Sequence, residues 1–130
     1  MLITQKPASR TNLQRFVRDA GSVLSFFGRG LAPAYSASKG GVAQLTKSLA
    51  MAWATDKIRV NAVAPGWIAT PLTQTLQDHP VRSAAILART PLNRWGQPQD
   101  VAGAVIFLCS PAANFITGII LPVDGGYLIA

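Results

Sequence analysis

One apolar run, KIRVNAVAP at residues 57–65, constrains the fold of this chain more than any other stretch. Its β-branched residues Ile58, Val60 and Val63 predict a strand over 58–64, and Pro65–Gly66 ends it. The run is apolar along its length, which is typical of a strand buried on both faces by helices. It therefore predicts a central strand of an α/β sheet.

Segments of helical periodicity flank this strand. Pro33 suits a first helical turn, and apolar residues recur at helical spacing through 42–53, which predicts a helix over 34–54. QPQDVAGAVIFLCS (97–110) opens with a proline and an acid, as helices do, and IILPV (119–123) predicts a second strand. Between them, 67–90 predicts two short helical stretches on the surface. The order helix–strand–helix–strand predicts a parallel sheet.

Length and composition are those of one globular domain. The chain has 130 residues, 49% of them hydrophobic, and lacks an apolar run of the roughly 18–20 residues that a membrane span needs. Its single cysteine, Cys109, excludes an intramolecular disulfide and suits a reducing compartment. The sole histidine, His79, has no partner cluster for a metal. We expect a cytoplasmic protein with no membrane partner and no metal.

The net charge of +7 is concentrated at the N-terminus, where residues 1–30 carry five basic side chains against Asp19 alone. A nucleic-acid arm or a presequence are two possible interpretations. Only Phe16 stands among the basic residues, which disfavours nucleic-acid binding. A cleavable presequence would have to end close to Ser22, which is a candidate catalytic position. We expect residues 1–20 to be a solvated, poorly ordered basic leader.

The stretch PAYSASKGG (33–41) places Tyr35 four residues ahead of Lys39 in the first predicted helix. Residues at this spacing share one helical face. A phenol is a poor base at neutral pH, but an ammonium about 5 Å away stabilises the phenolate by roughly 3 kcal/mol at an effective dielectric constant of about 20. The spacing can therefore make a tyrosine a usable proton shuttle. The alternative is an exposed tyrosine beside a solvated lysine.

Three further motifs accompany this pair. Ser22 lies thirteen residues before Tyr35, PGWIAT (65–70) follows the predicted strand, and RWGQPQDVAG (94–103) and VDGG (123–126) lie toward the C-terminus. Together they closely resemble the C-terminal half of the short-chain dehydrogenase/reductase family, over about residues 21–130. Within that family the chain looks most like members that act on sugar acids, such as gluconate and deoxygluconate dehydrogenases.

The resemblance implies a Rossmann-like α/β fold and an NAD(P)-dependent oxidoreductase that interconverts a secondary alcohol and a ketone. Tyr35 would be the general acid/base, Lys39 would assist it, and Ser22 would hold the oxygen of the small-molecule substrate. The cofactor-binding residues would be Tyr35, Lys39, Pro65, Gly66, Ile68 and Thr70. The resemblance favours NAD over NADP and implies a homo-oligomer. Trp67 is expected to pack in the core or to border the substrate pocket.

The sequence departs from the family pattern at its N-terminal side. Residues 1–20 match none of the family's first half, and the glycine-rich phosphate-binding turn is absent. RFVRDAG (15–21), where the family has a strand leading to Ser22, is a poor strand with three charges. We therefore expect a Rossmann-like sheet truncated at its N-terminal side, behind an unrelated leader. The alternative function is a catalytically inert remnant or an interaction protein.

Overall fold

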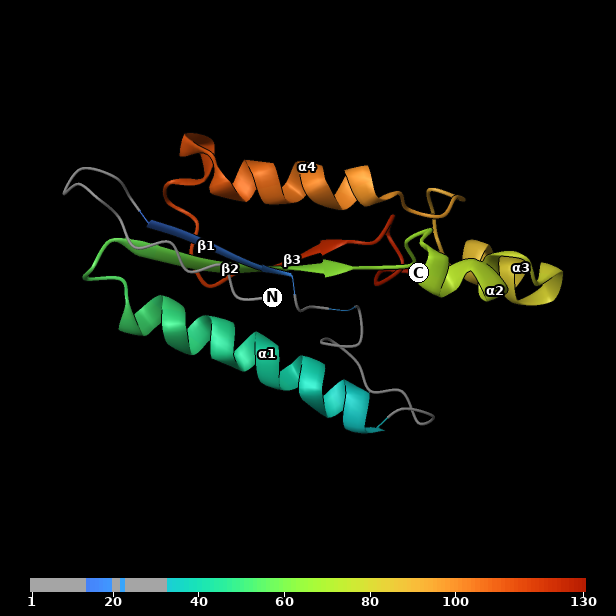
Figure 1. The fold of residues 1–130 in the computed structure, drawn as a ribbon, viewed down its shortest axis with the longest axis horizontal. Coiled ribbons are helices and arrows are strands. Elements are labelled where there is room, and N and C mark those ends of the chain that lie inside the picture. Colours follow the sequence, from blue (N-terminus) through green and yellow to red (C-terminus); the bar gives the residue numbers. More distant parts are fainter. Residues whose placement is uncertain (1–13, 20–21, 23–32) are drawn as a thin grey trace.

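The computed structural model describes residues 14–19, 22 and 33–130. Within them, three strands form one parallel sheet in the order β1-β2-β3: β1 (Gln14–Asp19), β2 (Ile58–Pro65) and β3 (Ile120–Val123). Helix α1 (Pro33–Ala52) covers one face of the sheet and α4 (Pro98–Cys109) the other (Figure 1). This arrangement confirms the predicted α/β class with a parallel sheet. Both long helices agree with their predicted positions.

The core is built around β2, as its composition predicts. The side chains of Val60, Ala62, Val63 and Ala64 are at most 1% exposed. β2 pairs with β1 along one edge, from Gln14↔Ile58 to Asp19↔Val63, and with β3 along the other. Because strands lie on both edges and helices on both faces, β2 is shielded from solvent on every side.

Two polar side chains of β2 are buried in this core. Arg59 donates through Nη2 to the carbonyl of Leu108 at 2.8 Å and through Nη1 to that of Ile116 at 3.2 Å. Asn61, fully buried, donates to the same Ile116 carbonyl at 3.0 Å and accepts from the Ile119 N–H at 3.2 Å. These bonds satisfy backbone groups at the end of α4 and in the segment that leads to β3. The two residues therefore fix the chain that leads into β3.

The expectation that RFVRDAG makes a poor strand is wrong. Residues Gln14–Asp19 form β1 and pair in parallel with β2 over six residues. Strand formation depends on the neighbour that supplies backbone hydrogen bonds more than on intrinsic propensity, and β2 offers a complete edge here. The remaining part of the basic leader lies outside the described residues, so the predicted domain boundary stays a prediction.

The segment between β2 and α4 forms short helices beyond the carboxyl end of the sheet. These are η2 (Pro71–Thr73), α2 (Gln74–Gln77) and α3 (Pro80–Ala88), and the further turn η3 (Pro111–Ala113) follows α4. Figure 1 places α2 and α3 past the tip of β2, at the end where α1 and α4 begin. Among the described helices, none combines the length and the apolar character that a membrane crossing requires.

Candidate functional site

The carboxyl ends of the three parallel strands lie at one edge of the sheet, together with the first turns of α1 and α4 (Figure 1). Ser22 follows β1, the segment 66–70 follows β2, and Asp124 follows β3. Ligands of open α/β sheets bind in the crevice outside these carboxyl ends. The topology therefore brings the predicted site residues to the edge where a ligand is expected.

A cavity of about 410 Å³ opens at this edge. Its volume lies in the range of small-molecule sites, about 300–1,000 Å³. It unites six of the seven predicted site residues, whereas Lys39 is not among its lining side chains. The lining residues are Ser22, Tyr35, Pro65, Gly66, Ile68, Thr70, Thr73, Pro98 and Val101. Thr73, Pro98 and Val101 were not predicted as site residues.

Tyr35 and Lys39 lie on one face of α1, one turn apart. The Lys39 Nζ is 5.2 Å from the centre of the Tyr35 ring, and the Tyr35 side chain is 48% exposed. The Ser38 hydroxyl donates to the Tyr35 carbonyl at 2.7 Å and anchors this turn. The cation thus stands beside a phenol that solvent or a ligand can reach. The catalytic roles of both residues stay predictions.

The segment after β2 approaches the segment after β3 so closely that only glycine fits at position 66. The Gly66 N–H donates to the Val123 carbonyl at 3.1 Å, and a Cβ on Gly66 would lie 2.7 Å from the Cα and the Cβ of Asp124. Such a distance is a steric clash with backbone. Gly66 therefore allows the chain after β2 to pass close to Asp124 and to line the cavity.

Residues 67–69 continue as a short extended segment whose one edge is held by Gly96. The Ala69 N–H donates to the Gly96 carbonyl at 2.8 Å, and the Gly96 N–H donates to the Trp67 carbonyl at 2.9 Å. A Cβ on Gly96 would lie 2.5 Å from the Ile68 Cδ1. Gly96 of the RWG motif therefore holds the residues on either side of Ile68, which lines the cavity.

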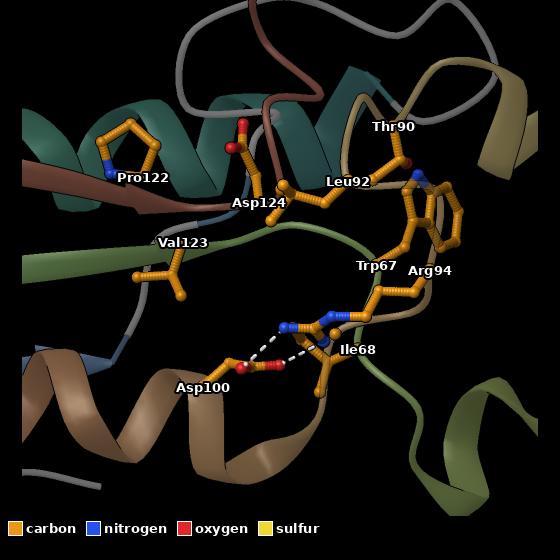
Figure 2. Close-up of a pocket in the computed structure, with 11 residues that line it drawn as sticks. Trp67, Ile68, Thr90, Leu92, Arg94, Asp100, Pro122, Val123 and Asp124 are labelled. Atoms are coloured by element: carbon orange, nitrogen blue, oxygen red, sulfur yellow. Dashed lines mark hydrogen bonds and ion pairs between the residues drawn. The ribbon is translucent and has the colours of Figure 1, made fainter.

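An ion pair fixes the start of α4 next to this segment (Figure 2). Arg94 donates from Nη1 and Nη2 to the two carboxylate oxygens of Asp100 at 2.7 and 3.0 Å, and the Gln97 N–H donates to Asp100 Oδ2 at 2.7 Å. The hydrogen bonds from Arg94 and from the Gln97 backbone lower the pKa of Asp100 to about 2. Asp100 is therefore a charged helix-capping residue, not a proton donor at neutral pH.

A second cavity, of about 330 Å³, lies beside this ion pair (Figure 2). Trp67 lines this cavity and does not line the one that holds Tyr35. Its ring packs edge-on against Trp95 and Tyr127, with ring centres 5.9 and 6.4 Å away. Trp67 thus packs against two aromatic rings and also lines a cavity. His79 caps the start of α3, and the described residues contain no group of three potential metal ligands.

Comparison with known proteins places the chain in a family. Residues 20–128 match the family profile described as enoyl-(acyl carrier protein) reductase. The chain is 51% identical over 107 residues to the 2-dehydro-3-deoxy-D-gluconate 5-dehydrogenase of Bacillus subtilis (strain 168). The aligned region covers 82% of this chain and 42% of that protein. The chain is 49% identical over 98 residues to the galactitol 2-dehydrogenase (L-tagatose-forming) of Cereibacter sphaeroides, covering 75% and 39%.

Solved structures of similar sequence have the same fold over most of this chain. A putative 2-deoxy-D-gluconate 3-dehydrogenase from Agrobacterium tumefaciens, with bound NADP, superposes with a TM-score of 0.86 at 49% identity, covering 89% of this chain and 47% of that one. The chain thus spans less than half the length of the relatives it matches. The parallel sheet, the site edge and the family profile lead to one conclusion: this chain is a member of the short-chain dehydrogenase/reductase family, with a Rossmann-like fold.

Proposed function

We propose that this chain carries the proton-transfer and nicotinamide-facing part of an NAD(P)-dependent oxidoreductase that interconverts a secondary alcohol and a ketone, with a sugar acid as substrate. The observation that carries the proposal is the shared cavity, where Ser22 and Tyr35 face the segment 65–70. The sugar-acid substrate rests on the similarity to 2-dehydro-3-deoxy-D-gluconate 5-dehydrogenase.

In this proposal each of three side chains has one task. The Tyr35 hydroxyl moves the proton to or from the substrate oxygen, and its exposure leaves it within reach of a ligand. Lys39, with its ammonium 5.2 Å from the Tyr35 ring centre, supplies the positive charge that favours proton release. Ser22 orients the substrate oxygen from across the cavity.

The residues present fit the nicotinamide end of a dinucleotide. Ile68 lines the cavity, and its N–H makes no hydrogen bond with any described residue. A carboxamide oxygen would satisfy that donor, and the Ile68 carbonyl offers an acceptor for the carboxamide nitrogen. The bound dinucleotide would supply or accept the hydride, while the chain itself binds, orients and handles the proton. The choice between NAD and NADP follows from the adenosine end, for which the sequence has no glycine-rich turn.

Two measurements test the proposal. Titration of isotope-labelled chain with reduced nicotinamide mononucleotide should shift the Ile68 and Thr70 amide resonances, because the ligand contacts that segment. Where the chain, alone or with a complementary half, reduces a ketone, Tyr35→Phe should remove nearly all of that turnover while preserving the fold, because only the proton-transfer hydroxyl is lost. Unchanged amide resonances at saturating probe would refute the cofactor site and favour an inert remnant or an interaction protein. Substantial turnover in Tyr35→Phe would refute its role as the acid/base.

We further propose that the chain acts as a homo-oligomer. On and beside α4, Ile106 is 69% exposed and Phe107 43%, and Phe115 is fully exposed. Apolar surface of this kind favours association with another copy. Light scattering that reports a monodisperse 13.7 kDa monomer would contradict this proposal. The cytoplasmic location stays a prediction.

A further inference from the structure

We propose that Thr73, oriented by Gln77, is a positioning residue that fixes the Ile68 peptide for the nicotinamide. The inference rests on the proposed function, since it concerns the same cavity. It adds two residues, outside the predicted set, that would set how well the segment 66–70 is organised before a ligand arrives. Thr73 lines the cavity, and Gln77 lies one turn further along, at the end of α2.

The Thr73 hydroxyl lies at the centre of a hydrogen-bond network. Its Oγ1 donates to the Ile68 carbonyl at 2.7 Å, accepts from the Thr70 N–H at 3.0 Å, and accepts from Gln77 Nε2 at 3.0 Å. A hydroxyl has one proton and two lone pairs, so these three bonds use its full capacity. Its one proton has two carbonyl acceptors in reach, that of Ile68 at 2.7 Å and that of Thr70 at 3.1 Å, and the Ile68 carbonyl is the nearer.

Gln77 decides this direction because its amide group is a donor. Its Nε2 reaches both Thr73 Oγ1 and, at 3.3 Å, the Thr70 carbonyl. An acceptor at the same place would instead attract the Thr73 proton and release the Ile68 carbonyl. Gln77 therefore acts on Ile68 through Thr73, without lining the cavity itself.

The Thr73 network and Gly96 hold opposite edges of one extended segment. Gly96 binds the Trp67 carbonyl and the Ala69 N–H. In extended backbone, successive residues direct their polar groups to alternate edges, so the N–H and carbonyl of Ile68 face away from Gly96, toward Thr73. Thr73 occupies one lone pair of the Ile68 carbonyl. No described residue bonds the Ile68 N–H or the second lone pair of its carbonyl, so both are offered to a carboxamide in a peptide plane that is already fixed.

Four substitutions in the full chain test this inference. Thr73→Val removes the hydroxyl at nearly constant volume, and Thr73→Ser keeps it. Gln77→Glu replaces the donor by an acceptor of the same shape. Gln74→Glu is the matched control: it adds the same charge to α2, but Gln74 Nε2 bonds Asp78 Oδ1 at 2.8 Å and does not touch Thr73. Two readouts are needed: amide hydrogen exchange at Thr70, and the affinity for reduced nicotinamide mononucleotide followed at the Ile68 amide resonance.

We expect Thr73→Val to accelerate Thr70 exchange, because the Thr70 N–H loses its acceptor, and we expect both Thr73→Val and Gln77→Glu to weaken mononucleotide binding about three- to tenfold, the range for loss of one hydrogen bond. Thr73→Ser and Gln74→Glu should match the wild type in both readouts. Faster exchange with unchanged affinity would overturn the inference, because Thr73 would then be merely structural. Failure of Thr73→Ser to restore binding would also overturn it. If the wild type itself does not bind the mononucleotide, the proposed function fails, and the positioning role fails with it.

Discussion

The contact between Gly66 and Asp124 predicts that Gly66→Ala destabilises the fold. The added methyl would lie 2.7 Å from the Cα and the Cβ of Asp124 and 3.2 Å from its carbonyl oxygen, so backbone must move to admit it. Displacement of Asp124 also disturbs its carboxylate, which accepts hydrogen bonds from the Gly126 and Leu128 N–H groups at 2.9 and 3.0 Å. Overpacking of this kind costs about 1–3 kcal/mol.

Gly41→Ala is the matched control, with the opposite expected sign. Gly41 lies inside α1, and a Cβ there would meet nothing within 4 Å. Replacing a glycine by alanine in a helix interior stabilises by about 1 kcal/mol. The two variants make the same chemical change, so they should differ by about 2–4 kcal/mol in the free energy of unfolding.

Urea denaturation followed by tryptophan fluorescence measures this difference, with all variants at one protein concentration. For an m-value near 2 kcal/mol/M, the midpoints of the two variants should differ by roughly 1–2 M. A Gly66→Ala midpoint equal to that of the wild type would refute the reasoning. It would mean that the segments after β2 and β3 can separate at no cost.

Three further predictions concern the Arg94–Asp100 ion pair, the buried Asn61 amide and the affinity for dinucleotides. Folding lowers the pKa of Asp100 from an ordinary 3.8 to about 2, so the stability that its carboxylate contributes is complete above about pH 4 and disappears as the pH falls toward 2. In urea denaturation at a series of pH values, an Asp100→Asn variant should lack this pH-dependent part of the free energy of unfolding. Asn61→Leu should cost about 1–3 kcal/mol in the same assay, because it removes a fully buried amide that bonds the Ile119 N–H and the Ile116 carbonyl, and an unchanged midpoint would contradict this network. NADH and NADPH should bind the chain with a Kd of about 1 mM or weaker in a calorimetric titration, because most of the affinity for a dinucleotide comes from its phosphates and adenosine. Micromolar binding would show that residues 1–20 or a partner chain supply the binding site for that part of the cofactor.

The elements that the sequence predicts are those whose own residues carry the signal. β2 follows from its β-branched run, and α1 and α4 follow from apolar periodicity and from prolines at their starts. β1 could not be found in this way, because a parallel edge on β2 stabilises it rather than its composition. Pairing of Tyr35 with Lys39 follows from helix geometry and needs no tertiary information.

The supporting role of Thr73 depends on its bond to the Ile68 carbonyl, which the sequence does not indicate. Gln77 lies four residues after Thr73, so helical spacing accounts for the bond between them, but not for the acceptor beyond Thr73. Thr73 leaves a faint signal, since a threonine three residues after Thr70 is typical of a capped turn. The burial of Arg59 and Asn61 inside an apolar strand was equally hidden, because their partners lie more than forty residues away.

The distance along the chain between Arg59 and its acceptors has a consequence for the order of folding. The guanidinium bonds carbonyls 49 and 57 residues further on, and β2 pairs with β3 across a similar separation. Such contacts require closure of long loops before they stabilise anything, and proteins dominated by them fold slowly. During synthesis, β2 emerges long before the end of α4 that its arginine binds. Until residues 108–123 have been added, the newly made chain must therefore hold β2 without its β3 neighbour and Arg59 without its carbonyl acceptors.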